Sequence, residues 1–130
     1  MNENMNKIIN LALEKYRTIY DFCNAIEINP GYFRSNYNHS RGDRIYAIAK
    51  GLNMDFDEVC DICNPNLHPL QREIFKRGYT INEFCAYSGL SPNLIRSICL
   101  KKNKHFNSTY SVLSDALGIP IDEVIRICNA

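Results

Sequence analysis

The stretch TINEFCAYSGLSPNLIRSICL, residues 80–100, predicts two short helices joined by a sharp turn. Its first residue is a threonine, and Glu83 follows three positions later, which is the capping-box pattern that marks a helix start. Gly89 can adopt the left-handed conformation that ends a helix. Ser91 and Pro92 then supply the N-cap and the first residue of a second helix. The apolar residues expected to hold this pair against a third element are Phe84, Cys85, Leu90, Ile95 and Ile98.

Length and composition favour a small soluble protein. The chain has 130 residues, of which 45% are hydrophobic and 22% charged, so it can form one domain or two very small ones. No apolar run approaches the roughly 20 residues of a membrane span, and the N-terminal sequence lacks the features of a signal peptide. We therefore expect a cytoplasmic protein with no membrane partner, in which the six cysteines are reduced thiols.

The charge is unevenly distributed along the chain. Residues 1–66 carry seven Lys and Arg against nine Asp and Glu, a balance of −2. Residues 67–130 carry eight against five, a balance of +3. The net charge of +1 therefore conceals a second half that is better suited to contact phosphates.

The two halves also share an internal repeat. Residues 18–35 match residues 80–97 at a shift of 62, with seven of 18 positions identical. Residues 52–64 match residues 117–129 at a shift of 65, with seven of 13 identical. The three-residue difference falls between the matching blocks, which places the added residues in a loop, where insertions are tolerated. A duplicated domain explains this pattern.

We accordingly predict two all-α domains, residues 1–65 as a degenerate copy and residues 66–130 as a more basic copy. Strand signals are weak throughout. The first copy is expected to form helices near 6–16, 18–25, 30–38, 43–51 and 55–63. The second is expected to form them near 69–77, 80–87, 91–101, 108–117 and 120–128. Asp43 and Ser108 are the expected N-caps of the fourth helices, and Asp55 with Glu58 is expected to cap the fifth helix of the first copy.

Five short helices with a helix-turn-helix at positions two and three resemble the lambda-repressor/Cro-type DNA-binding domain. The residues carrying the resemblance are the stretch 80–98 and the closing LGIPIDEV, residues 117–124, which matches the family's entry into its last helix. The resemblance covers nearly the whole chain, twice. It implies two tandem five-helix lambda-repressor-like helix-turn-helix domains, and a sequence-specific DNA-binding transcriptional regulator of bacterial, phage or mobile-element type. In this family the second helix of the motif enters the major groove of double-stranded DNA.

The resemblance also implies a set of DNA contacts. Arg96 is placed to pair with guanine, and Asn93 with adenine or a phosphate. The basic run at 101–105 follows the second recognition helix and can grip phosphates, or can simply complement the negative end of the helix dipole. The DNA-binding residues implied are Asn93, Arg96, Ser97, Lys101, Lys102 and Lys104, with Tyr32, Arg34 and Ser35 in the first copy.

A protein partner is the alternative. Both copies carry isoleucine, Ile19 and Ile81, where the family often places a DNA-contacting glutamine, and Leu94 and Tyr32 lie on the expected groove faces. Apolar contact residues and an acidic first half favour a protein-binding inhibitor on a helix-turn-helix fold, such as a phage anti-defence or anti-CRISPR-like protein that binds a host protein. A homodimer is compatible with either function.

Catalytic and metal chemistry are poorly represented in the sequence. The chain has no nucleophile elbow, no phosphate-binding glycine loop and no paired-histidine motif, so we expect no enzyme activity and no cofactor. Cys60 and Cys63, with His68 five residues further on, suggest zinc, but a second ligand pair is missing nearby. Cysteines that repeat between the copies, Cys23 with Cys85 for example, are better explained as small buried core residues. We therefore predict no metal site.

Overall fold

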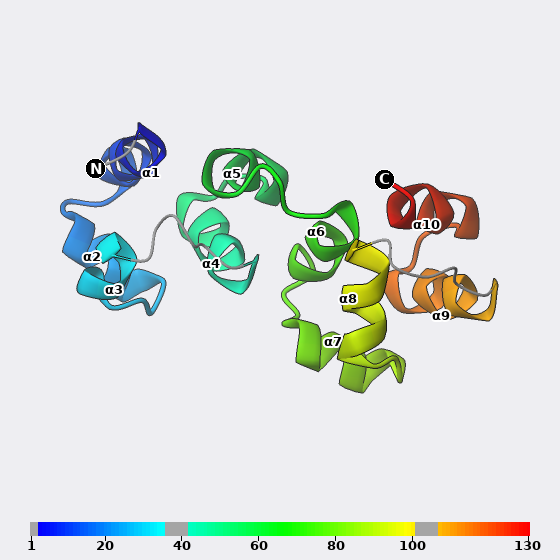
Figure 1. Cartoon of the computed structure of the whole chain (residues 1–130). Coiled ribbons are helices and arrows are strands. Elements are labelled where there is room, and N and C mark those ends of the chain that lie inside the picture. The colour runs from blue at the N-terminus through cyan, green and yellow to red at the C-terminus, as the bar shows by residue number, and fades with distance from the viewer. Residues whose placement is uncertain (1–2, 36–41, 101–106) are drawn as a thin grey trace. The chain divides into compact units, whose positions relative to one another are not determined.

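The computed structural model describes residues 3–35, 42–100 and 107–130, and all regular structure within these ranges is α-helical (Figure 1). This confirms the predicted all-α class. The helices fall into two compact units, unit 1 from Met1 to Leu67 and unit 2 from His68 to Ala130. None of the helices in the described ranges is long and apolar enough to cross a membrane.

Unit 1 is organised around its first helix. It contains α1 (Glu3–Lys15), α2 (Ile19–Ala25), α3 (Pro30–Ser35), α4 (Gly42–Leu52) and α5 (Phe56–Cys63). Helix α1 contacts α2, α4 and α5, while α2 packs on α3 and α4 on α5. The centre of the unit is aromatic, because the ring of Phe22 makes edge contacts with Tyr16 at 5.2 Å and with Phe33 at 6.0 Å between centroids.

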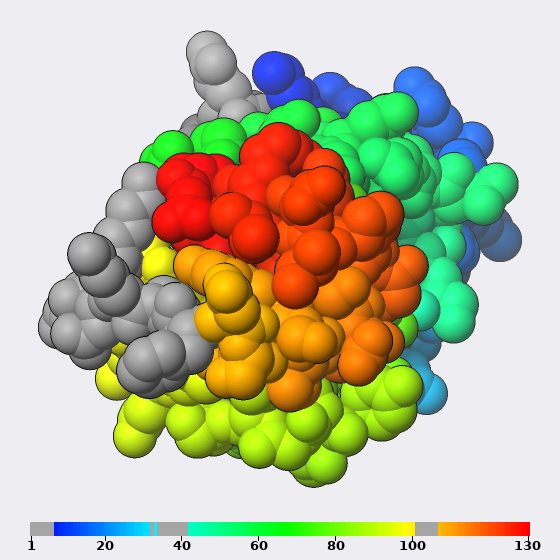
Figure 2. All heavy atoms as spheres, turned by 90° about the vertical axis from the view of Figure 1, so that its right-hand side faces the viewer, coloured from blue at the N-terminus to red at the C-terminus, as the bar shows by residue number. Residues whose placement is uncertain are grey.

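Unit 2 repeats this order. It contains α6 (Pro69–Phe75), α7 (Ile81–Ser88), α8 (Pro92–Leu100), α9 (Asn107–Leu117) and α10 (Ile121–Cys128). Helix α6 contacts α7 and α10, and α7 contacts α8 and α9. Helices α9 and α10 pack side by side and form the centre of the face of unit 2 seen in Figure 2, where they are orange and red. Each helix buries one apolar stripe, as the spacing of its hydrophobic residues requires.

The predicted helix positions agree with the structure within a few residues, except at residues 36–38 and 101, which lie outside the described ranges. Two of the predicted caps are wrong. Helices α4 and α9 begin at Gly42 and Asn107, so Asp43 and Ser108 lie inside the first turn. There the Asp43 carboxylate complements the positive end of the helix dipole and accepts a hydrogen bond from the backbone N–H of Arg44 at 3.0 Å. Asp55 is the N-cap of α5, but its side chain makes no capping hydrogen bond in the described structure.

The repeat is also visible in the backbone, at positions where the two copies have different residues. Glu27 and Gly89, which are 62 residues apart, both have left-handed φ angles of 60° and 82°. Asn53 and Gly118, which are 65 residues apart, have φ angles of 53° and 70°. These are the shifts of the two matching sequence blocks, so the two units bend the chain at the same places. Glycine takes this conformation freely, whereas a glutamate there is strained.

The buried core repeats in the same register. Side chains at matching positions of the two units are removed from solvent, and Phe22 and Phe84 are both 0% exposed. The other matching pairs are Ile8 with Leu70, Ala12 with Ile74, Cys23 with Cys85, Phe33 with Ile95, Leu52 with Leu117 and Val59 with Val124. The buried Cys23 and Cys85 confirm that these repeated cysteines are core residues. A shared set of buried positions therefore specifies both units.

A cation at the end of the first helix closes each unit. Arg77 donates to the carbonyl oxygen of Leu117 from Nε at 3.2 Å and from Nη2 at 2.8 Å. Lys15, the equivalent residue of unit 1, donates from Nζ to the carbonyl oxygen of Leu52. Both carbonyls belong to the last residue of the fourth helix of their unit, where backbone acceptors have no partner within the helix. The cation satisfies the acceptor and complements the negative end of the dipole.

Candidate nucleic-acid interface

The α7–α8 pair is set by its caps. Thr80 Oγ1 accepts from the backbone N–H of Glu83 at 3.1 Å, and a Glu83 carboxylate oxygen accepts from the N–H of Thr80 at 3.0 Å. Gly89 ends α7 in the left-handed conformation. The hydroxyl oxygen of Ser91 then accepts from the N–H of Leu94 at 3.1 Å, so Pro92 is the first residue of α8. The predicted capping box, left-handed glycine and serine cap are all confirmed.

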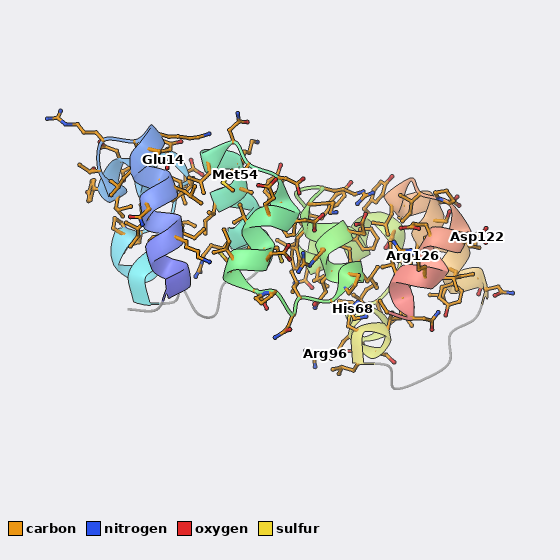
Figure 3. The ribbon with its side chains drawn as sticks, turned by 90° about the horizontal axis from the view of Figure 1, so that it is seen from above. Glu14, Met54, His68, Arg96, Asp122 and Arg126 are labelled. Atoms are coloured by element: carbon orange, nitrogen blue, oxygen red, sulfur yellow. The ribbon has the colours of Figure 1, made fainter. Side chains whose placement is uncertain are left out.

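Helix α8 has one buried and one exposed side. Ile95 and Ile98 are 2% and 1% exposed and anchor the helix to the core of unit 2. Asn93 and Arg96 are exposed, three residues apart and therefore on neighbouring turns of the same face. Figure 3 shows the Arg96 side chain extending from α8 away from the body of unit 2. The described part of α8 contains no acidic residue, so this face has no internal counter-charge.

Of the three apolar residues expected to face outward, one is buried and two are half-buried. Ile19 is 8% exposed, and Ile81 and Leu94 are half-buried and pack against the core of unit 2. The expectation that these residues form a contact surface is therefore wrong for Ile19. In short helices, the first residue and the residue beside the buried stripe lie close enough to the core to be covered. The apolar residue that is exposed on α8 is Leu100, at 54%.

The remaining predicted site residues are only partly described. Ser97 is half-buried beside the exposed face of α8. Tyr32, Arg34 and Ser35 belong to α3, but their side chains lie outside the described part of the structure. Lys101, Lys102 and Lys104, with the rest of the basic run, lie outside the described ranges altogether. The structure thus brings Asn93 and Arg96 together on one face of α8, with the half-buried Ser97 beside them.

The surface of unit 2 also carries aromatic side chains. The rings of Tyr79 and Tyr87 stack at 5.7 Å between centroids with 17° between their planes, and Tyr79 makes an edge contact with the buried Phe84 at 6.0 Å. Tyr87 is 62% exposed, as is Tyr20 in unit 1. Composition alone cannot separate these tyrosines from core residues, because both kinds follow apolar helical spacing.

Cys60, Cys63 and His68, the residues that suggested zinc, have packing and capping roles in the structure. Cys60 and Cys63 are buried in α5, and the Cys60 thiol donates to the carbonyl oxygen of Asn64 at 3.3 Å. Within the described ranges no three His, Cys, Asp or Glu side chains gather closely enough to hold a metal ion. His68 is half-buried, and its Nδ1 accepts from the N–H of Leu70 at 3.1 Å as the N-cap of α6.

Two thiols of unit 2 are held protonated. Burial raises the pKa of Cys99 to about 11. The pKa of Cys128 is also raised to about 11, mainly by burial and to a smaller extent by the nearby Cys99. Cys99 is half-buried near the end of α8 and Cys128 is in the core, so both behave as packing residues and not as reactive thiolates at neutral pH.

Comparison with known proteins gives no relative from which to transfer a function. No family model matches the sequence, and searches of curated proteins and of solved structures return no significant match.

Proposed function

We propose that the protein is a sequence-specific DNA-binding regulator of the lambda-repressor/Cro type, with two tandem helix-turn-helix units and α8 as the principal recognition helix. The observation that carries this proposal is the exposed face of α8, where Asn93 and Arg96 lie on neighbouring turns of a helix anchored by Ile95 and Ile98. Arginine reads guanine and asparagine reads adenine in the major groove. A helix with such a face, held rigidly at the end of a capped turn, fits that groove.

The charge of the second half supports the same role. Residues 67–130 have a balance of +3, and the acidic residues of unit 2 lie outside α8. Glu73 is paired with Lys76 at 2.9 Å and with Arg77 at 3.1 Å, and Glu123 is paired with Arg126. A phosphate backbone approaching α8 therefore meets Arg96 with no acidic side chain on the same helix. Ile81 and Leu94 pack partly against the core of unit 2, so they offer less apolar surface to a protein partner at this face.

Selection from a random duplex library, followed by fluorescence-anisotropy titration of the selected DNA at low salt, tests this function. We expect Arg96→Ala to weaken binding about tenfold or more and to relax the preference at one base pair. Arg126→Ala is the matched control, because it removes the same charge from an exposed arginine of α10. The doubly substituted Lys101→Ala, Lys102→Ala protein is expected to lose affinity for all sequences and to show a shallower salt dependence.

Two outcomes would refute the DNA-binding proposal. The first is the absence of duplex binding even at low salt, where the phosphate contribution is strongest. The second is an equal effect of Arg96→Ala and Arg126→Ala, which would reduce the role of Arg96 to general charge.

A second candidate function is binding of a host protein, as an inhibitor that keeps this fold. The observation that favours it is the exposure of Leu100 at 54% on α8 and of Tyr87 at 62% on α7. Aromatic and large apolar side chains supply most of the binding energy of protein interfaces. In a pull-down from nuclease-treated host lysate, a specific protein retained by the wild type and lost with Leu100→Glu would support this function. Recovery of nucleic acid alone would count against it.

A further inference from the structure

Unit 1 contains a pocket next to its left-handed turn. The cavity has a volume of about 420 Å³, which lies in the range of small-molecule sites. Its walls come from the end of α1, from the turn after α2 and from one side of α4. The lining residues are Tyr16, Ala25, Ile26, Glu27, Tyr46, Ala47, Lys50 and Gly51. All of them belong to unit 1, so the pocket is independent of the α8 face of unit 2.

The pocket is bounded by fixed groups. The Tyr16 hydroxyl donates to the carbonyl oxygen of Gly51 at 2.8 Å, which ties the end of α1 to α4. Helix α4 approaches the turn closely, because a Cβ atom at Gly51 would lie 2.4 Å from Ile26 Cγ2 and 3.1 Å from Phe22 Cε1. The walls are therefore preorganised, which lowers the entropic cost of binding.

Glu27 is the unusual residue of this pocket. Its φ of 60° is strained for a residue with a side chain, and the equivalent position of unit 2 is Gly89, which takes the same turn without strain. Strained residues persist where the surrounding structure holds them, and they concentrate at functional sites. The Glu27 side chain is exposed, and among the described residues its carboxylate has neither an ion-pair nor a hydrogen-bond partner. A glycine would serve the turn better.

The chemistry of the lining defines one class of ligand. The body of the pocket is formed by aliphatic side chains and by the rings of Tyr16 and Tyr46, which suit an apolar group. The exposed side chains of Glu27 and Lys50 add opposite charges, and Lys50 Nζ lies 5.8 Å from the centroid of the Tyr46 ring. A ligand with only a cation is repelled by Lys50, and one with only an anion is repelled by Glu27. A molecule that carries both charges beside an apolar group is complementary to Glu27, to Lys50 and to the apolar wall.

We propose that this pocket binds a free apolar α-amino acid, with its ammonium group on Glu27, its carboxylate on Lys50 and its side chain against Tyr16, Tyr46 and Ile26. A residue inside a peptide lacks both charges, and a terminal residue carries only one of them. The pocket therefore suits a free amino acid better than an amino-acid residue of a peptide.

Titration of ¹⁵N-labelled full-length protein with L-phenylalanine and L-leucine tests the proposal. We expect saturable shifts of amides lining the pocket with a Kd on the order of 0.1–1 mM, from the size of the ligand. L-Phenylalanine amide lacks the carboxylate, N-acetyl-L-phenylalanine lacks the ammonium, and glycine lacks the side chain. Each of these probes is expected to bind about tenfold more weakly than L-phenylalanine.

Variants separate a binding role from a structural one. Glu27→Gln and Lys50→Met are expected to weaken L-phenylalanine binding about tenfold, whereas the controls Glu14→Gln and Lys7→Met, at exposed positions of α1, leave it unchanged. Glu27→Gly copies Gly89 of unit 2, so it should abolish the Glu27 contribution while the melting temperature stays at or above that of the wild type. Absence of shifts at 10-fold the highest expected Kd, about 10 mM, would overturn the proposal. So would equal binding by N-acetyl-L-phenylalanine, or binding that Glu27→Gln leaves intact.

Discussion

Units 1 and 2 share their helix order and buried core, and they differ in the residues at their exposed positions. Both bury a phenylalanine at the second helix and close the fourth helix with a cation from the first. At the left-handed turn they diverge, since unit 1 has Glu27 beside a pocket and unit 2 has Gly89. The comparison indicates that a few buried positions and caps specify the fold, while exposed positions near the turns are free to acquire separate functions.

This difference also suggests that the two units have different binding functions. Unit 2 presents the Asn93 and Arg96 face and carries the positive balance of the chain, and unit 1 carries the pocket with Glu27 and Lys50. If both proposals hold, one unit binds DNA and the other binds a small molecule. Each proposal is tested on its own unit, so the failure of one leaves the other standing.

The largest effect is expected from truncating the equivalent phenylalanines of the two cores. Phe22→Ala and Phe84→Ala each remove a fully buried ring, which typically costs about 3–5 kcal/mol. Amide hydrogen exchange should then show residues 1–67 losing protection in Phe22→Ala and residues 68–130 losing it in Phe84→Ala. Equal loss over the whole chain in both variants would contradict the division into two units.

An intermediate effect is expected from the close approach of α4 to the turn in unit 1. Gly51→Ala places a Cβ atom 2.4 Å from Ile26 Cγ2, and such overpacking costs about 1–3 kcal/mol. Unit 2 has Ala116 at the equivalent position, half-buried against its core. Its replacement by glycine should cost only about 1 kcal/mol, from helix propensity. Urea denaturation measures both, and a harmless Gly51→Ala would show that the turn can move away from α4.

A smaller effect is expected at the cations that close each unit. Arg77→Met removes both donors to the Leu117 carbonyl and should cost about 1–2 kcal/mol. Lys15→Met removes a single donor from the equivalent Leu52 carbonyl and should cost about 1 kcal/mol or less. Arg77→Lys makes unit 2 resemble unit 1 and should fall between the wild type and Arg77→Met in thermal denaturation. A loss in Arg77→Lys as large as in Arg77→Met would show that the guanidinium geometry, and not a cation as such, is required.

The smallest effect is a loss of stability of unit 2 at alkaline pH. The pKa values of Cys99 and Cys128 are raised to about 11 from an ordinary 9.0, so the unfolded chain loses these protons first. Stability from this source is complete below pH 9 and falls as the pH rises toward 11. The double variant Cys99→Ser, Cys128→Ala should show a flatter decline in melting temperature over this range. A decline as steep as that of the wild type would assign it to other groups.

The sequence predicted the helices well because their ends depend on local chemistry. Thr80 with Glu83, and Ser91 with Pro92, act through hydrogen bonds and backbone angles within a few residues, so their pattern can be recognised without tertiary structure. The duplication added independent support, since a pattern seen twice is unlikely to arise by chance. The misplaced caps Asp43 and Ser108 show the limit of this approach, because acidic and hydroxyl residues are also favourable inside the first turn.

Features that depend on contacts between distant residues could not be predicted. Whether Ile81 and Leu94 face solvent depends on how α7 and α8 lie on the core, and an error of one position on a short helix changes the answer. The cation at Arg77 lies 40 residues from its acceptor at Leu117. The pocket of unit 1 requires the approach of α4 to a strained turn, and no local pattern marks Glu27 as left-handed, because that conformation is typical of glycine or asparagine.

Contact between DNA and α8 of unit 2 can be tested by a residue-level footprint on a duplex obtained by selection. Amide shifts and exchange rates of the ¹⁵N-labelled protein are recorded with and without saturating DNA. We expect the largest changes at residues 92–100, including Asn93 and Arg96, and small changes on α10 around Arg126. Changes concentrated on α10 or in unit 1, with residues 92–100 unaffected, would contradict the assignment of α8 as the recognition helix.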